Sequence, residues 1–169
     1  MQLSTLGSSA QELLQAFAAQ LVATNPNFPL PPNQYVGAGE IPWDGEGLYV
    51  YLAGGITGQP GSPQTRNIPA TQGITFSVGF YVMLVRSVSS FGYWAGGDID
   101  IPSDADLGFE GQRAVSDAGA LLAAAAKIKS AKDIVTNSGA FVIGEVSTIG
   151  PQGGLSAVRL YLDLGIEQA

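Results

Sequence analysis

The sequence predicts an α+β fold, in which a mainly antiparallel or mixed sheet of four to five strands carries two helices on one face. Two long segments place apolar residues at helical spacing, and four to five shorter runs alternate at strand spacing. The order is helix, two or three strands, helix and hairpin, rather than a regular strand–helix alternation. At 169 residues the chain is expected to form one domain, residues 1–169.

The first predicted helix runs from about Ser9 to Ala23, within an amino-terminal helical segment 1–24. Ser9 and Glu12 have the spacing of a capping box, which satisfies free amides at a helix start. The apolar residues that follow recur on one helical face. Pro26 ends the helix because proline disfavours helical geometry in the residue before it.

The stretch Tyr35–Gly61 is predicted to form a short strand, a corner and a second strand. Trp43 is the expected anchor of the corner. In the strand Gly47–Leu52 the residues alternate, so Tyr49 and Tyr51 share one face and the aliphatic residues share the other. We expect Trp43, Tyr49 and Tyr51 to be fold anchors.

The strongest predicted strand is Ile74–Val88. It is apolar on one face along its length and on the other in its middle, so it is expected to be central in the sheet, with Phe80 as a further fold anchor. Two strands close the chain, Ala140–Ile149 and Leu155–Ile166. The glycines of Gly150–Gly154 suit the turn between them. The same turn is a weak candidate phosphate cradle, because it lacks a following helix and a P-loop lysine.

The second predicted helix runs from Glu110 to about Asn137. Acidic residues come early in it and lysines come late, which is the order that the helix dipole favours. The spacing of its apolar residues predicts a buried stripe of Val115, Ala118, Leu121, Leu122, Ala125, Ile128, Ala131 and Val135.

Two long connections, 54–73 and 89–109, are predicted to be assembly loops. Connections of this length in a compact domain are usually functional or disordered. The first is poor in charge and rich in Gly and Pro, so it is either an arm that docks a neighbour or a mobile loop. Its candidate contact residues are Gly58, Gln59, Pro60, Gln64 and Arg66.

The second connection combines aromatic residues with four aspartates, and its candidate contact residues are Tyr93, Trp94, Asp98 and Asp100. A calcium loop and a catalytic carboxylate pair are the alternatives to a solvated or neighbour-facing acidic loop. The calcium alternative is weakened because the central glycine and bidentate glutamate of a helix-loop-helix site are absent. A run of charges is more often solvated.

The composition excludes several classes of function. The chain has no histidine and no cysteine, which removes the usual general base, thiolate chemistry and common metal ligands. A net charge of −7 with scattered basic residues argues against gripping nucleic acid. We therefore expect no enzyme activity, no cofactor and no metal.

The amino terminus lacks the basic start and apolar run of a signal peptide, and no segment approaches the ~20 apolar residues of a membrane span. The expectation is a soluble protein that this route does not export. Only 12% of the residues are charged, against a typical share of about 25%, so part of the surface is expected to be covered by other subunits.

Four stretches resemble tail terminator proteins of long-tailed phages that infect actinobacteria. They are Tyr35–Gly61, with its Val-x-x-Gly-Glu-Ile-Pro-Trp-Asp corner and Gly-x-Pro-Gly exit, the Phe-x-Val-x-Phe-x-Val-x-Leu-Val-Arg strand ending at Arg86, the helix containing Ser116-Asp117-Ala118, and the turn Gly150–Gly154. The resemblance covers about Tyr35 to Ile166. The family's usual form has a shorter segment in place of 89–109.

The resemblance implies a structural virion protein that forms a ring, usually a hexamer, on the last ring of the tail tube. Such a ring ends tube polymerisation and presents the surface that joins the head. The implied partners are further copies of the chain, the major tail tube protein and a head–tail connector or stopper. DNA would pass through the lumen without specific binding, and the protein would be assembled in the host cytoplasm and reside in the tail or neck. An acidic chain suits such a lumen.

Two other functions stay open at this point. The first is a head-side neck protein, a stopper or adaptor that also forms rings. The second is a hydrolase or metal-dependent nuclease built on Asp98, Asp100, Asp104 and Asp106, which would have to work without His or Cys.

Overall fold

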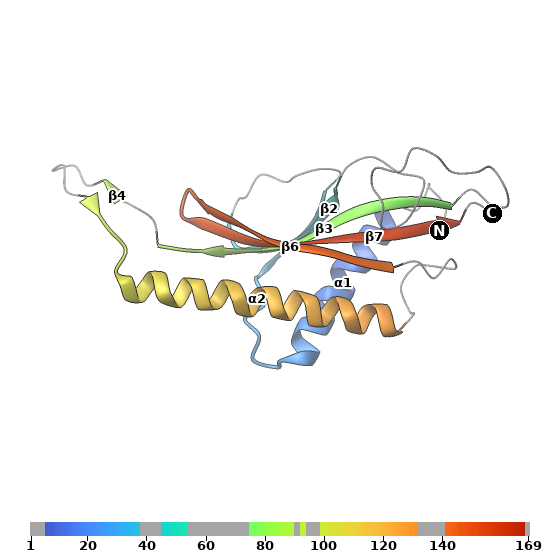
Figure 1. Ribbon diagram of the computed structural model, residues 1–169, viewed down its shortest axis with the longest axis horizontal. Coiled ribbons are helices and arrows are strands. Elements are labelled where there is room, and N and C mark those ends of the chain that lie inside the picture. The colour runs from blue at the N-terminus through green and yellow to red at the C-terminus, as the bar shows by residue number, and fades with distance from the viewer. Residues whose placement is uncertain are drawn as a thin grey trace.

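The protein is a five-stranded sheet with two helices on one face, as the computed structural model shows (Figure 1). It describes residues 6–37, 45–53, 75–89, 92–93, 99–131 and 141–167. In chain order the elements are α1 (Leu6–Thr24), β1 (Asn33–Gly37), β2 (Gly47–Leu52), β3 (Thr75–Ser87), β4 (Gly92–Tyr93), β5 (Ile99–Asp100), α2 (Asp104–Ala131), β6 (Phe141–Gln152) and β7 (Leu155–Glu167). The predicted α+β class is confirmed.

The sheet has the order β1-β2-β3-β7-β6, and β3 is its central strand. Strands β2, β3, β7 and β6 pair in antiparallel fashion, and β1 pairs with β2 in parallel. The longest pairing joins β3 to β7, from Thr75 opposite Glu167 to Ser87 opposite Leu155. The prediction of a central position for the strand 74–88 is confirmed. A separate two-stranded ribbon pairs β4 with β5.

The hydrophobic core lies between the sheet and the two helices. From β2 and β3 it takes Leu48, Val50, Val78, Phe80, Val82 and Leu84, and from β7 it takes Val158, Leu160, Leu162 and Leu164. Helix α1 contributes Leu13, Leu14, Phe17 and Leu21. These residues alternate along the strands as predicted, because successive side chains of a strand point to opposite faces.

The opposite face of the sheet has its own cluster. It is built on Tyr49, Tyr51, Met83, Val85 and Ala157, all buried. Tyr49 and Tyr51 therefore share a face, as the alternation of β2 predicts. Asp163 of β7 lies on this side too and is only 1% exposed.

Both helices begin earlier than predicted. Helix α1 starts at Leu6, so Ser9 lies inside it, buried, and does not cap it. Helix α2 starts at Asp104 instead of Glu110, and with β4 and β5 this gives regular structure to much of the predicted loop 89–109.

The earlier start of α2 has a local cause, a capping box formed by Ser103 and Asp106. The Asp106 amide donates to the Ser103 hydroxyl at 3.2 Å, and the Ser103 amide donates to the Asp106 carboxylate at 3.3 Å. The Ser103 hydroxyl also donates to that carboxylate at 2.6 Å. This Ser-x-x-Asp arrangement satisfies free amides at the helix start.

The buried stripe of α2 differs from the prediction. The buried residues are Asp117, Leu121, Ala124, Ala125 and Ile128, whereas Val115 is 74% exposed and Leu122 40% exposed. Ala131 is also exposed, and Val135 lies outside the described residues. The prediction is confirmed for Leu121, Ala125 and Ile128 and wrong for Val115 and Leu122, because the buried face of α2 is rotated so that it includes Asp117.

The β6–β7 hairpin turns at Gly153 and Gly154. Both have positive φ, 58° and 78°, which glycine adopts without the steric cost that a Cβ imposes. The predicted turn is thus confirmed, although β6 extends to Gln152 and leaves only these two residues between the strands.

Candidate assembly site

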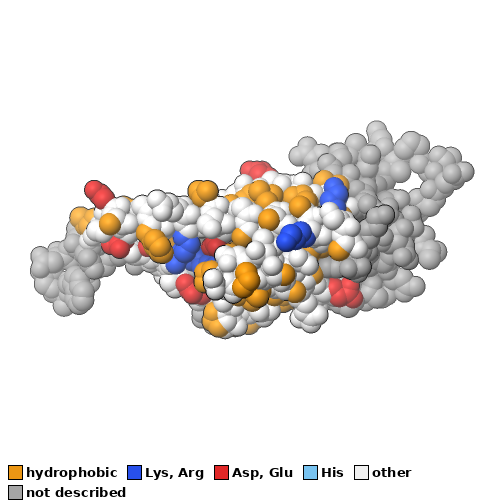
Figure 2. Space-filling view, turned by 90° about the horizontal axis from the view of Figure 1, so that it is seen from below, with side chains coloured by type: hydrophobic (Ala, Val, Ile, Leu, Met, Phe, Trp, Pro, Cys, Tyr) orange, Lys and Arg blue, Asp and Glu red, His pale blue; other side chains and the backbone are white. Residues whose placement is uncertain are grey.

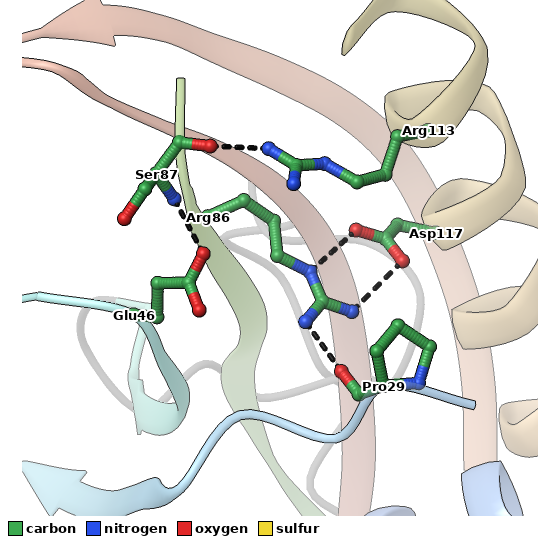
Figure 3. Close-up of polar contacts among 6 residues, drawn as sticks. All are labelled: Pro29, Glu46, Arg86, Ser87, Arg113 and Asp117. Carbon is green, nitrogen blue, oxygen red and sulfur yellow. Dashed lines mark hydrogen bonds and ion pairs between the residues drawn. The ribbon is translucent and has the colours of Figure 1, made fainter. Parts of the chain in front are cut away.

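The carboxyl end of β3 is a junction where four distant parts of the chain meet (Figure 3). At its centre, the Arg86 guanidinium binds Asp117 of α2 through two hydrogen bonds. Nε lies 2.9 Å from Oδ2 and Nη2 lies 3.1 Å from Oδ1. Both side chains are buried, at 7% and 3% exposure. A buried charge needs such pairing because desolvation alone would be strongly unfavourable.

The remaining donors of Arg86 reach the segment before β1. Nη1 donates to the carbonyl oxygen of Pro29, and the guanidinium carbon lies 5.4 Å from the centre of the Phe28 ring. This contact is within the range of a cation–π interaction. Arg86 therefore ties the chain between α1 and β1 to both the central strand and α2.

Ser87 is held from both sides. Its amide donates to Oε1 of Glu46 at 2.8 Å, and its carbonyl accepts a hydrogen bond from the Arg113 guanidinium (Figure 3). Two residues later, the Ser89 amide donates to the Glu110 carboxylate. Glu110, Arg113 and Asp117 are spaced three and four residues apart, so they project from one face of α2. That face holds the end of β3 by three separate polar contacts.

The hairpin tip is the fourth partner of this junction. The Val88 amide donates to the carbonyl of Gly154 at 2.8 Å, which continues the β3–β7 pairing into the turn. The end of β3 is thereby fixed between α2 and the β6–β7 turn.

A groove of about 500 Å³ opens beside this junction. Among the described residues, its lining is mostly apolar or glycine and Glu110 is the single charged residue; the residues are Val88, Ser89, Pro102, Leu107, Glu110, Gly111, Pro151, Gly153, Gly154 and Ser156. The Glu110 carboxylate accepts a hydrogen bond from the Ser89 amide, which holds the one charge of this lining at the end of β3. It suits an apolar segment better than a charged ligand.

The other face of the sheet carries a row of tyrosines. Tyr51, Tyr81 and Tyr161 stand opposite one another on β2, β3 and β7, with ring centres 5.4 and 5.5 Å apart. The Arg159 guanidinium carbon lies 4.3 Å from the centre of the Tyr81 ring. Burial raises the pKa of the Tyr161 hydroxyl above its usual value, and the charge of Asp163 and the neighbouring Tyr81 add to the effect.

Glycines make room for the Tyr161 ring. A Cβ on Gly79 would lie 2.7 Å from the Tyr161 hydroxyl oxygen, and one on Gly144 would lie 2.6 Å from the ring. Gly144 is in the stretch where the β6–β7 register shifts, so this irregularity sits directly beside the ring. The tyrosine row thus depends on close approach of side chain to backbone.

Most predicted contact residues lie outside the described part of the chain. These are Gly58, Gln59, Pro60, Gln64, Arg66, Trp94 and Asp98, together with the expected anchor Trp43. Tyr93 and Asp100 belong to the β4–β5 ribbon, where Tyr93 pairs with Ile99 and Asp100 with Gly92. Tyr49, Tyr51 and Phe80 are buried.

Three of the four aspartates of the predicted acidic loop lie in described elements, and Asp98 lies outside the described residues. Asp100 is in β5, whereas Asp104 and Asp106 are in the first turn of α2, where acidic residues are favoured by the helix dipole. Within the residues described above, no three acidic side chains gather as a metal site would require. Neither described helix is long and apolar enough to span a membrane.

Sequence reasoning did not predict the Arg86–Asp117 pair. Each residue sits in a stretch that supported the family resemblance, yet pairing between a strand and a helix 31 residues apart has no local signal. One clue was available, since both residues interrupt otherwise apolar or small-residue runs. The sequence also contains the signal for the capping box at the start of α2, a serine at 103 followed three residues later by Asp106.

Comparisons with known proteins give little further identification. No protein-family model matches the chain, and no curated protein matches it. Among solved structures it is similar to a chain described as "Virion of native gene transfer agent (GTA) particle". The identity is 16%, the match covers 96% of this chain and 95% of that one, and the TM-score is 0.41. A likeness of this degree carries no argument about function.

Proposed function

We propose that this chain is a structural virion protein that forms a ring on the end of a phage tail tube, ends tube polymerisation and provides the surface for head joining. The ring is proposed to be a hexamer. Its partners are further copies of the chain, the major tail tube protein and a connector or stopper protein. This assignment starts from the sequence resemblance to tail terminators and gains its main support from the β3 junction.

The observation that carries the proposal is the meeting of all four resembling stretches at one place. The stretch 35–61 supplies Glu46 and the central strand supplies Arg86, while the long helix supplies Asp117. The closing turn supplies the carbonyl of Gly154. Arg86 and Asp117 join two of the stretches directly, and Glu46 and Gly154 bind Ser87 and Val88, which follow the strand motif. Their meeting supports a resemblance of whole fold, on which the functional assignment depends.

The surface also suits a permanent assembly. A chain with 12% charged residues has few charges with which to cover itself, and its exposed apolar side chains favour burial against other proteins. The groove beside the junction is one recess for an apolar segment of a neighbour. A net charge of −7 would allow DNA to pass through a ring without adhering.

The first test is to add the purified protein to polymerising tail tube protein and to image the tubes. We expect tubes that stop growing and carry a closed ring as extra density at one end. The matched variant is Asp117→Ala, which should disrupt the junction and with it capping. Tubes that grow to the same length with and without the wild-type protein would overturn the proposal.

A head-side stopper or adaptor ring is the alternative. The two roles predict opposite partners after heads and tails are separated, because a terminator stays on the tube and a stopper stays on the head. Probing both fractions for the chain distinguishes them.

We further propose that the chain is not an enzyme. A hydrolytic activity lost on combined substitution of Asp98, Asp100, Asp104 and Asp106, with assembly intact, would contradict this.

A further inference from the structure

One side of α2 carries a stripe without charge between its ends, and its members are exposed except Ala118, which is half-buried against the core. The stripe begins at Asp104 and ends at Lys129, and its members are three or four residues apart: Asp104, Leu107, Gly111, Val115, Ala118, Leu122, Ala126 and Lys129. This spacing keeps them on one side of a helix. The stripe spans about 38 Å at the rise of an α-helix.

The large side chains of the stripe are open to solvent. Leu107 is 52% exposed, Val115 74% and Leu122 40%. Single exposed apolar residues are ordinary, but here three share one face of one helix. Figure 2 views the helix side of the molecule, where hydrophobic side chains lie on the surface between acidic and basic ones.

Glycines on the same side of α2 have no packing role within the chain. A Cβ on Gly108, Gly111 or Gly119 would meet nothing within 4 Å. Glycine in a helix interior is less favourable than alanine, because it loses more backbone freedom on folding. Close approach of another backbone would account for glycine at these positions, and no described element of this chain makes that approach.

We propose that this stripe binds the same stripe of a second copy of the chain, with the two α2 helices antiparallel about a two-fold axis. The inference does not depend on the proposed tail function. Neighbours in a ring meet through two different surfaces, whereas this contact uses one surface twice. It therefore joins chains outside any single ring, as a dimer before assembly or as a contact between rings.

When two copies of the stripe lie antiparallel, the large side chains of one face small residues of the other. With Asp104 set opposite Lys129 of the second copy, Leu107 faces Ala126 and Leu122 faces Gly111. Val115 faces Ala118 next to the axis. Each large side chain thus meets a small one, which lets the helices approach closely along the whole stripe. The intervals between successive members follow the same order from either end of the stripe. Each member of one copy therefore faces a member of the other copy along the whole length.

The charges favour the same arrangement. Asp104 and Lys129 are both exposed and lie at opposite ends of the stripe, so antiparallel pairing brings opposite charges together at both ends. A parallel pairing would set like charges against each other. Because each chain carries −7, two copies repel over most surfaces, and a charge-free stripe with complementary ends is where that repulsion is smallest.

Mutation of neighbouring helix positions tests the surface. We expect the wild-type mass in sedimentation equilibrium to rise towards the dimer with concentration, and Val115→Arg to remain a monomer. Ser116→Arg is the matched control, because it adds the same charge at the adjacent exposed position off the stripe and should dimerise like the wild type. A monomeric wild type, or equal loss of the dimer in both variants, would overturn the proposal.

Cysteine crosslinking tests the direction. The chain has no native cysteine. On oxidation, a mixture of Leu107→Cys and Ala126→Cys should give a disulfide-linked heterodimer. Leu107→Cys alone should not crosslink, because its two copies would be about 28 Å apart along the helices. Crosslinking of Leu107→Cys alone would show another arrangement, as would failure of the mixture. The exchange Asp104→Lys with Lys129→Asp should restore a dimer that each single change weakens.

Discussion

Arg86 on the central strand and Asp117 on α2 form a buried, two-hydrogen-bond ion pair that fixes the helix layer to the sheet. The 2.9 and 3.1 Å contacts satisfy both carboxylate oxygens, and the third guanidinium nitrogen is bound by the Pro29 carbonyl. Because the pair is buried, its removal leaves a charge that neither water nor another side chain can easily compensate. Asp117 lies on the same face of α2 as the buried residues Leu121, Ala124, Ala125 and Ile128.

Asp117→Ala should lower the free energy of unfolding by about 3–5 kcal/mol, because it leaves the Arg86 charge buried without its partner. Denaturant unfolding measures the change. The double variant Arg86→Met, Asp117→Leu should recover much of the loss, since it removes both charges. Gln112→Ala, at an exposed position of the same helix, is the control and should be nearly neutral. A loss in the double variant equal to that in Asp117→Ala would contradict the role of the unpaired charge.

Ser103→Ala should destabilise the protein by about 1 kcal/mol, because the hydroxyl caps the first turn of α2. The helix start should also fray, which amide hydrogen exchange in the first turn would detect as faster exchange. Ser116→Ala changes an exposed serine inside the same helix and should not destabilise. If both variants behave alike, Ser103 is not the cap.

Gly153→Ala and Gly119→Ala should change the stability of the protein in opposite directions. Gly153 has φ of 58°, so a Cβ there strains the hairpin turn and should cost on the order of 1 kcal/mol. Gly119 lies in a helix with open space around it, so alanine should stabilise the monomer by about 1 kcal/mol. Thermal unfolding of the two variants, compared with the wild type, measures both effects. If both substitutions raised or both lowered the melting temperature, the assigned turn geometry would be contradicted.

Tyr161 should make the protein sensitive to alkali. Its pKa is raised above 10.0 in the folded state, so the folded chain keeps a proton that the unfolded chain has already lost at high pH. This contribution to stability is present below pH 10 and is lost as the pH rises through the folded pKa. Tyr161→Phe should therefore show a smaller alkaline loss of stability than the wild type in unfolding curves at increasing pH. Tyr35→Phe, at an exposed tyrosine, is the control for loss of one hydroxyl.

The strands were the most predictable part of the fold. In β2 and β3 the alternation of side chains predicted which residues face the helices and which form the tyrosine side, because the period of two is fixed by the backbone. The hairpin turn could be predicted equally well from its glycines. The start of α2 was predicted too late, although Ser103 and Asp106 supplied a local signal for it.

The candidate site was far less predictable. Its sequence-based contact residues fell largely outside the described residues, and the junction of Arg86, Ser87 and Asp117 was not anticipated. Hydrogen bonds between residues distant in sequence depend on how the elements pack, so no local pattern indicates them. The exposed stripe of α2 was missed for the same reason, since Val115 and Leu122 look like core residues when their helix is considered alone.

By itself, the sequence determined the α+β class, the two faces of each strand and the position of the turns, because these follow from local periodicity and glycine conformation. The tertiary structure alone decided the strand order, the pairing of β3 with β7 and the rotation of α2 about its axis. That rotation buries Leu121, Ala124, Ala125 and Ile128 in the core and brings Asp117 to Arg86. Burying Asp117 against Arg86 turns Val115 outward, and this leaves an apolar face on the surface of a chain that has little charge to cover it.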